Sequence, residues 1–92
     1  MIQFLVHEEA DNVGVATVDI PAGEKARGLY MDTQKAIEMK ILENIPLGHK
    51  IALKDLKVEG SVIKYGHDVG RVVADIKAGG HVHIQNLKTR RW

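Results

Sequence analysis

The segment Asp75-Ile76-Lys77-Ala78-Gly79-Gly80-His81-Val82-His83-Ile84-Gln85-Asn86 decides our interpretation of the fold, because it joins a turn signal to an alternating strand. Successive side chains of a β-strand point to opposite faces. His81 and His83 therefore share one face of a strand that we expect over residues 81–87. Val82 falls on the other, buried face. The pattern predicts a half-buried strand that carries a row of imidazoles.

The turn at the start of this segment recurs along the chain. Its pattern is an acid or amide, then Ile, two further residues and Gly, and the copies are Asp19–Gly23, Asn44–Gly48 and Asp75–Gly79. We expect each Ile to enter the core and each Gly to adopt a positive φ. In the first copy, Pro21 is expected at the first central position of the turn. The uneven spacing indicates a recurrent turn and not a solenoid repeat.

The rest of the chain is also read mostly as strands. Apolar and β-branched residues in alternation predict strands near residues 4–6, 13–20, 37–41, 51–53, 61–65 and 71–74. Thr33 to Glu43 also contains good helix formers, so a helix stays open there. We expect a single helical turn over Ala52–Leu56 and a loop over Lys25–Gly28. The fold class is therefore mainly β, with short strands and tight turns.

Composition limits the classes of function. The 92 residues suit one domain, 1–92, and 45% of them are hydrophobic while 27% are charged. Lys and Arg number 13 against 12 Asp and Glu, which argues against a general nucleic-acid binder. There are no cysteines, so disulfides and thiolate chemistry are excluded. No apolar run reaches membrane-spanning length and no signal peptide is evident, so we expect no membrane partner and a cytoplasmic location.

A series of motifs, taken in order, carries a family resemblance. It comprises Ile45–Leu53, Gly60, Val62–Gly66, Val69-Gly70, Asp75-Ile76, Gly79, His81-Val82-His83 and Asn86. The series resembles the SAF-type small domain of the altronate and galactarate dehydratase family. Residues 6–15 and 88–92 look most like the small, alpha subunit of the related sulfolactate sulfo-lyases. The resemblance implies a small β-clip (SAF-like) domain over the whole chain.

The resemblance also implies a chemistry. In this family a lyase eliminates water, or sulfite in the sulfo-lyases, from a 2-hydroxy acid such as altronate, galactarate or sulfolactate. The reaction needs a base for the proton next to the carboxylate and a stabiliser for the enediolate. The family implies a divalent metal, typically iron, held mainly by a large catalytic subunit. We therefore expect a small subunit that is inactive alone and helps to bind a small hydroxy acid.

His81 and His83 match the family's His-x-His motif and are our catalytic candidates. They are also potential metal ligands. Gln85 stands where many relatives have a third histidine, and an amide is a poor transition-metal ligand beside imidazole. Proton transfer or hydrogen bonding does not depend on that third histidine. The alternative is that the pair belongs to a solvated strand face.

Four further residues are expected to bind substrate: Lys64, Tyr65, His49 and Asn86. Lys64 could meet a carboxylate, and Tyr65 could hydrogen-bond a hydroxyl. His49 could face the partner or simply cap its bend, and Asn86 could orient an imidazole or be an ordinary strand-end residue. A solvated lysine and a half-buried tyrosine are the structural alternatives.

The chain ends in Arg90, Arg91 and Trp92, which we assign to the interface with the large subunit because Trp and Arg are frequent interface anchors. A nucleic-acid clamp is the alternative, but no basic stripe accompanies it. Two other functions stay open for the whole chain. It could be a stand-alone β-clip module that binds a carbohydrate or hydroxy acid, or a purely structural subunit.

Overall fold

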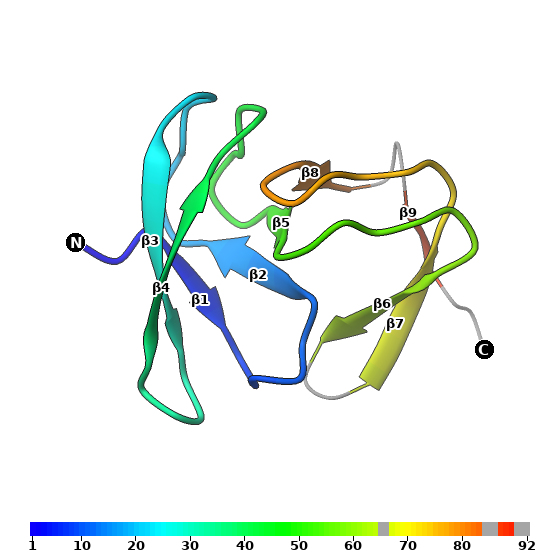
Figure 1. Ribbon diagram of the computed structural model, residues 1–92, viewed down its shortest axis with the longest axis horizontal. Coiled ribbons are helices and arrows are strands. Elements are labelled where there is room, and N and C mark those ends of the chain that lie inside the picture. The colour runs from blue at the N-terminus through cyan, green and yellow to red at the C-terminus, as the bar shows by residue number, and fades with distance from the viewer. Residues whose placement is uncertain (65–66, 84–86, 90–92) are drawn as a thin grey trace.

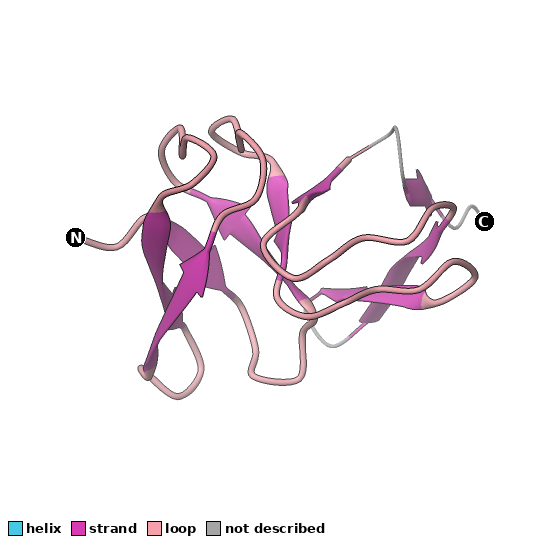
Figure 2. Cartoon of the chain, turned by 45° about the horizontal axis from the view of Figure 1, so that its top comes forward, coloured by secondary structure: helices cyan, strands magenta, loops and turns pink. Residues whose placement is uncertain are grey.

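The computed structural model describes residues 1–64, 67–83 and 87–89, and Figure 2 shows these ranges as strands and loops without a helix. The strands are β1 (Phe4–Val6), β2 (Val13–Ala16), β3 (Lys25–Tyr30), β4 (Ala36–Lys40), β5 (Lys50–Ala52), β6 (Ser61–Lys64), β7 (His67–Val72), β8 (His81–Val82) and β9 (Leu87–Thr89). The described ranges thus offer no helix that could cross a membrane. The predicted mainly β class is confirmed.

The strands form two sheets. Six of them pair in the order β4-β3-β1-β2-β5-β8, and the other three pair in the order β6-β7-β9. The β3–β4 hairpin lies at one end of the molecule and the β6–β7 hairpin at the other, with β1, β2 and β5 between them (Figure 1). The only parallel pairing in the described sheets joins β1 to β3.

The single phenylalanine of the chain is fully buried at the centre of the larger sheet. Phe4 pairs with Gly28 of β3, and a Cβ atom built at Gly28 would overlap its ring. On the β2 side, a Cβ atom at Gly14 would lie 3.0 Å from the same ring. The two glycines therefore make room for the aromatic ring between neighbouring strands.

The recurrent turns bind one another in pairs. Ile20 and Ile45 form an antiparallel bridge. The Oδ1 atom of Asp19 accepts a hydrogen bond from the Leu47 amide, and the Oδ1 atom of Asn44 accepts one from the Ala22 amide, both at 2.8 Å. Each turn thus caps the backbone of the other, which explains why an acid or amide opens each copy.

A second pair repeats this arrangement and contains a copy that the sequence pattern missed. Leu56 bridges Ile76. Asp75 accepts from the Val58 amide at 2.7 Å, and Asp55 accepts from the Ala78 amide at 2.9 Å. The fourth copy therefore begins at Asp55, with Leu in place of Ile.

The fourth copy lacks the usual glycine. Gly23, Gly48 and Gly79 have φ angles of 88°, 86° and 87°, and the equivalent residue of the fourth copy is Glu59, with φ 71°. A side chain in this left-handed region is strained by about 1 kcal/mol or more. The turn imposes this conformation on Glu59, because the hydrogen bond from the Gly60 amide to the Lys57 carbonyl, at 2.8 Å, closes the turn around it.

Two apolar clusters make up the described core. One is built on the larger sheet and comprises Phe4, Val6, Ala16, Ile20, Ala26, Ile41, Ile45 and Ile51. The other lies toward the smaller sheet and comprises Val13, Ala52, Leu56, Val62, Val72, Ile76 and Val82. Every turn copy contributes its bridging Ile or Leu to one of these clusters, as expected for the three copies seen in the sequence.

Asn12 ties the two sheets together at the start of β2. Asn12 is buried, with 7% of its surface exposed. Its Nδ2 atom donates to the Ser61 carbonyl at 2.9 Å, and its Oδ1 atom accepts from the Ile63 amide at 2.6 Å. The amide side chain thus satisfies two backbone groups of β6.

Several sequence-based expectations are wrong in detail. The helical turn expected over Ala52–Leu56 is absent, because Asp55 opens the fourth turn copy. The loop expected over Lys25–Gly28 is part of β3, where parallel pairing with β1 and antiparallel pairing with β4 override its polar composition. Pro21 is the first residue of its turn and not a central one, since its carbonyl accepts from the Glu24 amide.

The strand expected over residues 81–87 is also wrong, because it is not continuous. His81–Val82 pairs with β5, whereas Leu87–Thr89 pairs with β7 in the other sheet. Thr33–Glu43, for which the sequence allowed either a helix or a strand, contains the strand β4, which forms a hairpin with β3.

Candidate functional site

Two of the recurrent turns deliver histidines to adjacent strands. His49 follows Gly48 and directly precedes β5, and His81 opens β8. These strands pair antiparallel, with Ile51 opposite His81. One residue beyond the last pair, the same register sets His49 opposite His83. The fold therefore brings His49 close to His81 and His83, which lie 32 and 34 positions later in the sequence.

The three rings lie in a loose stack, which we call the histidine cluster (His49, His81 and His83). The ring centroids of His49 and His83 are 4.0 Å apart, and the two planes differ by 18°. His49 and His81 are 5.0 Å apart at 17°, and His81 and His83 are 5.6 Å apart at 11°. In addition, the Nδ1 atom of His49 lies 2.8 Å from the Nε2 atom of His81. One of these nitrogens carries the proton that the other accepts.

The cluster is half-buried, while Val82, the residue between His81 and His83, is fully buried. Val82 has 0% of its surface exposed and belongs to the second apolar cluster. His81 and His83 retain intermediate exposure. This alternation anchors β8 in the core through Val82 and leaves the imidazoles partly accessible.

Charged neighbours act on the cluster from two sides. The His81 amide donates to the Oε2 atom of Glu43 at 3.1 Å. Partial burial lowers the pKa of His81 from 6.5, the charges of His49 and His83 lower it further, and the Glu43 carboxylate opposes this shift. Desolvation, His49 and Lys50 likewise lower the pKa of His83. At neutral pH both imidazoles are therefore mainly uncharged.

Uncharged imidazoles can take part in two kinds of chemistry. Each has a ring nitrogen with a lone pair, so it can accept a proton from a bound molecule and later return it. The same lone pair can bind a cation. One ring nitrogen from each of the three residues lies within 4.8 Å of the others. Among the described residues, no other group of three or more His, Asp or Glu side chains meets this criterion.

Of the other sequence-predicted site residues, the structure describes only the backbone position of Lys64. Lys64 ends β6, which belongs to the three-stranded sheet. Tyr65, Asn86 and Gln85 lie outside the described residues, and so do the tail residues Arg90, Arg91 and Trp92. Their assignments as substrate-binding or interface residues remain predictions.

Sequence reasoning treated His49 separately from the His81–His83 pair and did not consider Glu43. The recurrent turn contained the missing signal, because both His49 and His81 come just after its glycine. What the sequence could not show was that β5 and β8 are neighbours. Glu43 precedes the second turn copy, and its proximity to His81 depends on packing between segments 38 residues apart.

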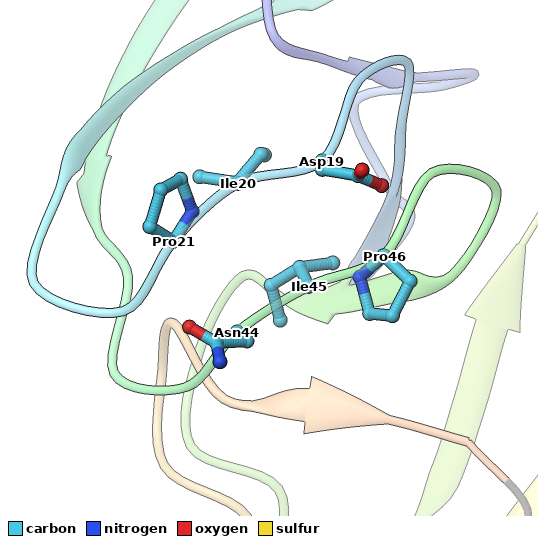
Figure 3. Close-up of a pocket in the computed structure, with 6 residues that line it drawn as sticks. All are labelled: Asp19, Ile20, Pro21, Asn44, Ile45 and Pro46. Carbon is cyan, nitrogen blue, oxygen red and sulfur yellow. The ribbon is translucent and has the colours of Figure 1, made fainter.

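A surface hollow lies elsewhere, between the first two turn copies. It has a volume of about 400 Å³ and is lined by Asp19, Ile20, Pro21, Asn44, Ile45 and Pro46 (Figure 3). Its two polar side chains already accept hydrogen bonds from the opposite turn. No histidine lines this hollow, so it is a consequence of the turn pairing and adds nothing to the cluster.

Several known proteins resemble this chain, two of those named here over nearly its full length. The sequence profile of the altronate/galactarate dehydratase SAF domain matches residues 2–90. The (2R)-sulfolactate sulfo-lyase subunit alpha of Chromohalobacter salexigens is 45% identical over 92 residues, covering 99% of this chain and 98% of that protein. The subunit of the same name from Paracoccus pantotrophus is 57% identical over 49 residues, or 53% of this chain and 73% of the relative. Altronate dehydratase of Bacillus subtilis is 35% identical over 89 residues, which cover 97% of this chain but only 17% of that enzyme.

Proposed function

Since this chain belongs to the altronate/galactarate dehydratase SAF domain family, we propose that it is the small subunit of a lyase acting on a 2-hydroxy acid. The observation that carries the proposal is the pattern of coverage. The chain spans 98% of a protein named as a sulfo-lyase subunit, but 17% of an altronate dehydratase. The match covers nearly all of a named subunit in the first relative and a small part of a longer enzyme in the second. The leaving group is then sulfite or water.

The histidine cluster is the part of this chain that we assign to the shared active site. Elimination from a 2-hydroxy acid begins with removal of the proton next to the carboxylate, and an uncharged imidazole is a suitable base. His81 and His83 meet this requirement at neutral pH, because burial and neighbouring positive charges lower the pKa of each. In this proposal His49 contacts His81 and His83 and orients them, and Lys64 and Tyr65 bind the substrate.

We assign the other catalytic groups and most of the metal ligands to a partner subunit. A larger catalytic subunit supplies the rest of the active site and most ligands of a divalent metal, which the family resemblance implies to be iron. The tail residues Arg90, Arg91 and Trp92 dock on that subunit, and Asn86 lies at the edge of the shared site. The complex works in the cytoplasm, without nucleic acid or membrane.

Reconstitution with a larger family member tests this proposal. The untagged chain, the larger chain and their mixture are each assayed with sulfolactate, altronate and galactarate under reducing conditions with ferrous ion. We expect turnover from the mixture only, seen as sulfite release or as the keto product of dehydration. Turnover by this chain alone, or equal turnover by the larger chain without it, contradicts the subunit role. Binding of a hydroxy acid by this chain alone, without turnover in any mixture, instead favours a stand-alone binding module.

A further inference from the structure

We propose that His49, His81 and His83 form a binding site for one divalent first-row transition-metal ion on this chain itself. Three imidazoles, one on β8 and the others directly before β5 and directly after β8, bring one ring nitrogen each to within 4.8 Å of the others. The site concerns only residues of this chain. A ring nitrogen that binds the ion cannot also accept a proton, so the base role proposed above belongs to the cluster without a bound ion.

The spacing of the nitrogens is close to what a metal ion requires. Metal–imidazole bonds of about 2.0–2.1 Å place neighbouring ligand nitrogens roughly 2.9–3.4 Å apart, depending on the geometry of the ion. His49 Nδ1 and His81 Nε2 already lie 2.8 Å apart. All three nitrogens lie within 4.8 Å of one another, so the nitrogen of His83 must approach by at most roughly 1.5–2 Å, which a side-chain rotation can supply.

The stacked rings must turn to admit the ion. A bound metal lies near the plane of each imidazole ligand, but the three planes are nearly parallel, at 11° to 18°. Rotation about χ2 redirects the lone pairs toward a common point, and this torsion has a broad energy profile in histidine. All three side chains are only partly buried, so the rotation does not disturb the core.

The backbone under the cluster is held firmly, which keeps the cost of forming the site low. Val82 is fully buried between His81 and His83, and β8 pairs with β5 through Lys50 and Ile51. The His81 amide is also fixed by Glu43. A site preorganised on paired strands loses little conformational entropy when the ion binds.

The donor set selects the class of ion. Imidazole nitrogens favour Zn²⁺, Co²⁺, Ni²⁺, Cu²⁺ and Fe²⁺, whereas Mg²⁺ and Ca²⁺ prefer oxygen ligands. Three imidazoles also leave at least one coordination position open for water or another ligand, as in catalytic rather than structural zinc sites. Binding of the ion replaces the hydrogen bond between His49 and His81, and the proton in that bond moves to a ring nitrogen that does not face the ion.

Titration of the untagged, chelator-treated full chain with Co²⁺ and Zn²⁺ tests the site. Calorimetry and the visible Co²⁺ absorption should each show one equivalent bound. His49→Ala, His81→Ala and His83→Ala should each weaken binding by more than about 100-fold, because each removes a ligand and not only a supporting contact. His7→Ala is the matched control, since His7 lies outside the cluster beside Glu8, and it should bind like the original chain.

A second measurement needs no substitution. In the NMR spectrum, one equivalent of Co²⁺ should shift or broaden the signals of His49, His81 and His83 before those of His7, and the same amount of Mg²⁺ should leave them unchanged. Undiminished Co²⁺ binding in the three cluster variants, equal perturbation of His7, or an equal response to Mg²⁺ would overturn the proposal. A failure here leaves the reconstitution assay unaffected, so the two proposals fail separately.

Discussion

The Nδ1 atom of His49 lies 2.8 Å from the Nε2 atom of His81, although the residues are 32 positions apart in the sequence. His49 directly follows the turn Asn44–Gly48, and His81 opens β8 after the turn Asp75–Gly79, so the contact links two of the recurrent turns. It needs one protonated and one unprotonated nitrogen, so it weakens when both rings are charged. The ionisation of His81 is therefore linked to the stability of this part of the fold.

The pH dependence of His81 follows from its surroundings. Burial, then the charges of His49 and His83, lower its pKa below 6.5 in the folded chain, so the unfolded chain binds this proton more tightly. The contribution of His81 to stability is therefore complete above pH 6.5 and is lost as the pH falls toward the folded pKa. An NMR titration of the chelator-treated chain should give a midpoint below 6.5 for His81.

Glu43→Gln provides the matched variant. It removes the carboxylate that opposes the shift but retains an oxygen that can accept from the His81 amide. The His81 midpoint should therefore fall further in this variant. A midpoint at or above 6.5 in the original chain, or a rise in the variant, would show that the electrostatic description of the cluster is wrong.

Glu59→Gly should stabilise the chain. Glu59 has φ 71° at the turn position where the other three copies have glycine. Glycine removes the steric cost of this conformation, for a net gain of about 0.5–1 kcal/mol after the greater freedom of the unfolded chain is included. Denaturant unfolding, followed by circular dichroism, measures the change.

Glu59→Ala is the control for this prediction, because Glu59 also lies 3.6 Å from Arg71 in an exposed ion pair. Alanine loses the ion pair but keeps the Cβ atom, so the difference between the two variants isolates the backbone effect. An alanine variant as stable as the glycine variant would show that the turn is not strained.

Asn12→Ala should destabilise the chain by roughly 1–3 kcal/mol, because it removes the hydrogen bonds that the buried Asn12 side chain makes to the Ser61 carbonyl and the Ile63 amide. Asn44→Ala removes one hydrogen bond, to the Ala22 amide, at an exposed position. It should cost about 1 kcal/mol or less. Equal unfolding midpoints for the two variants would contradict the role of Asn12 in joining the sheets.

Local patterns in the sequence predicted the parts of the fold that depend on local chemistry. The turn signature at Asp19, Asn44 and Asp75 correctly marked bends with a buried Ile and a glycine of positive φ. The alternation at His81-Val82-His83 correctly placed Val82 in the core. Both signals act over a few residues, where steric preference and side-chain periodicity decide the structure.

Features that depend on distant pairing were not predictable in the same way. The polar segment at Lys25–Gly28 becomes a strand because β1 and β4 pair with it on both sides. The fourth turn copy was hidden because Leu56 and Glu59 replace the expected Ile and Gly. The approach of His49 to His81 depends on the pairing of β5 with β8, which no local pattern specifies.

Turnover of the reconstituted two-chain enzyme carrying His81→Ala or His83→Ala tests the central claim most directly. Assembly is followed by size-exclusion chromatography, and His7→Ala is the control. If this cluster is part of the active site, kcat should fall by roughly 10²-fold or more when the residue that transfers the proton is lost, while assembly is unchanged. Full activity of both variants in an intact complex would contradict the account and would show that the histidine cluster is a solvated strand face.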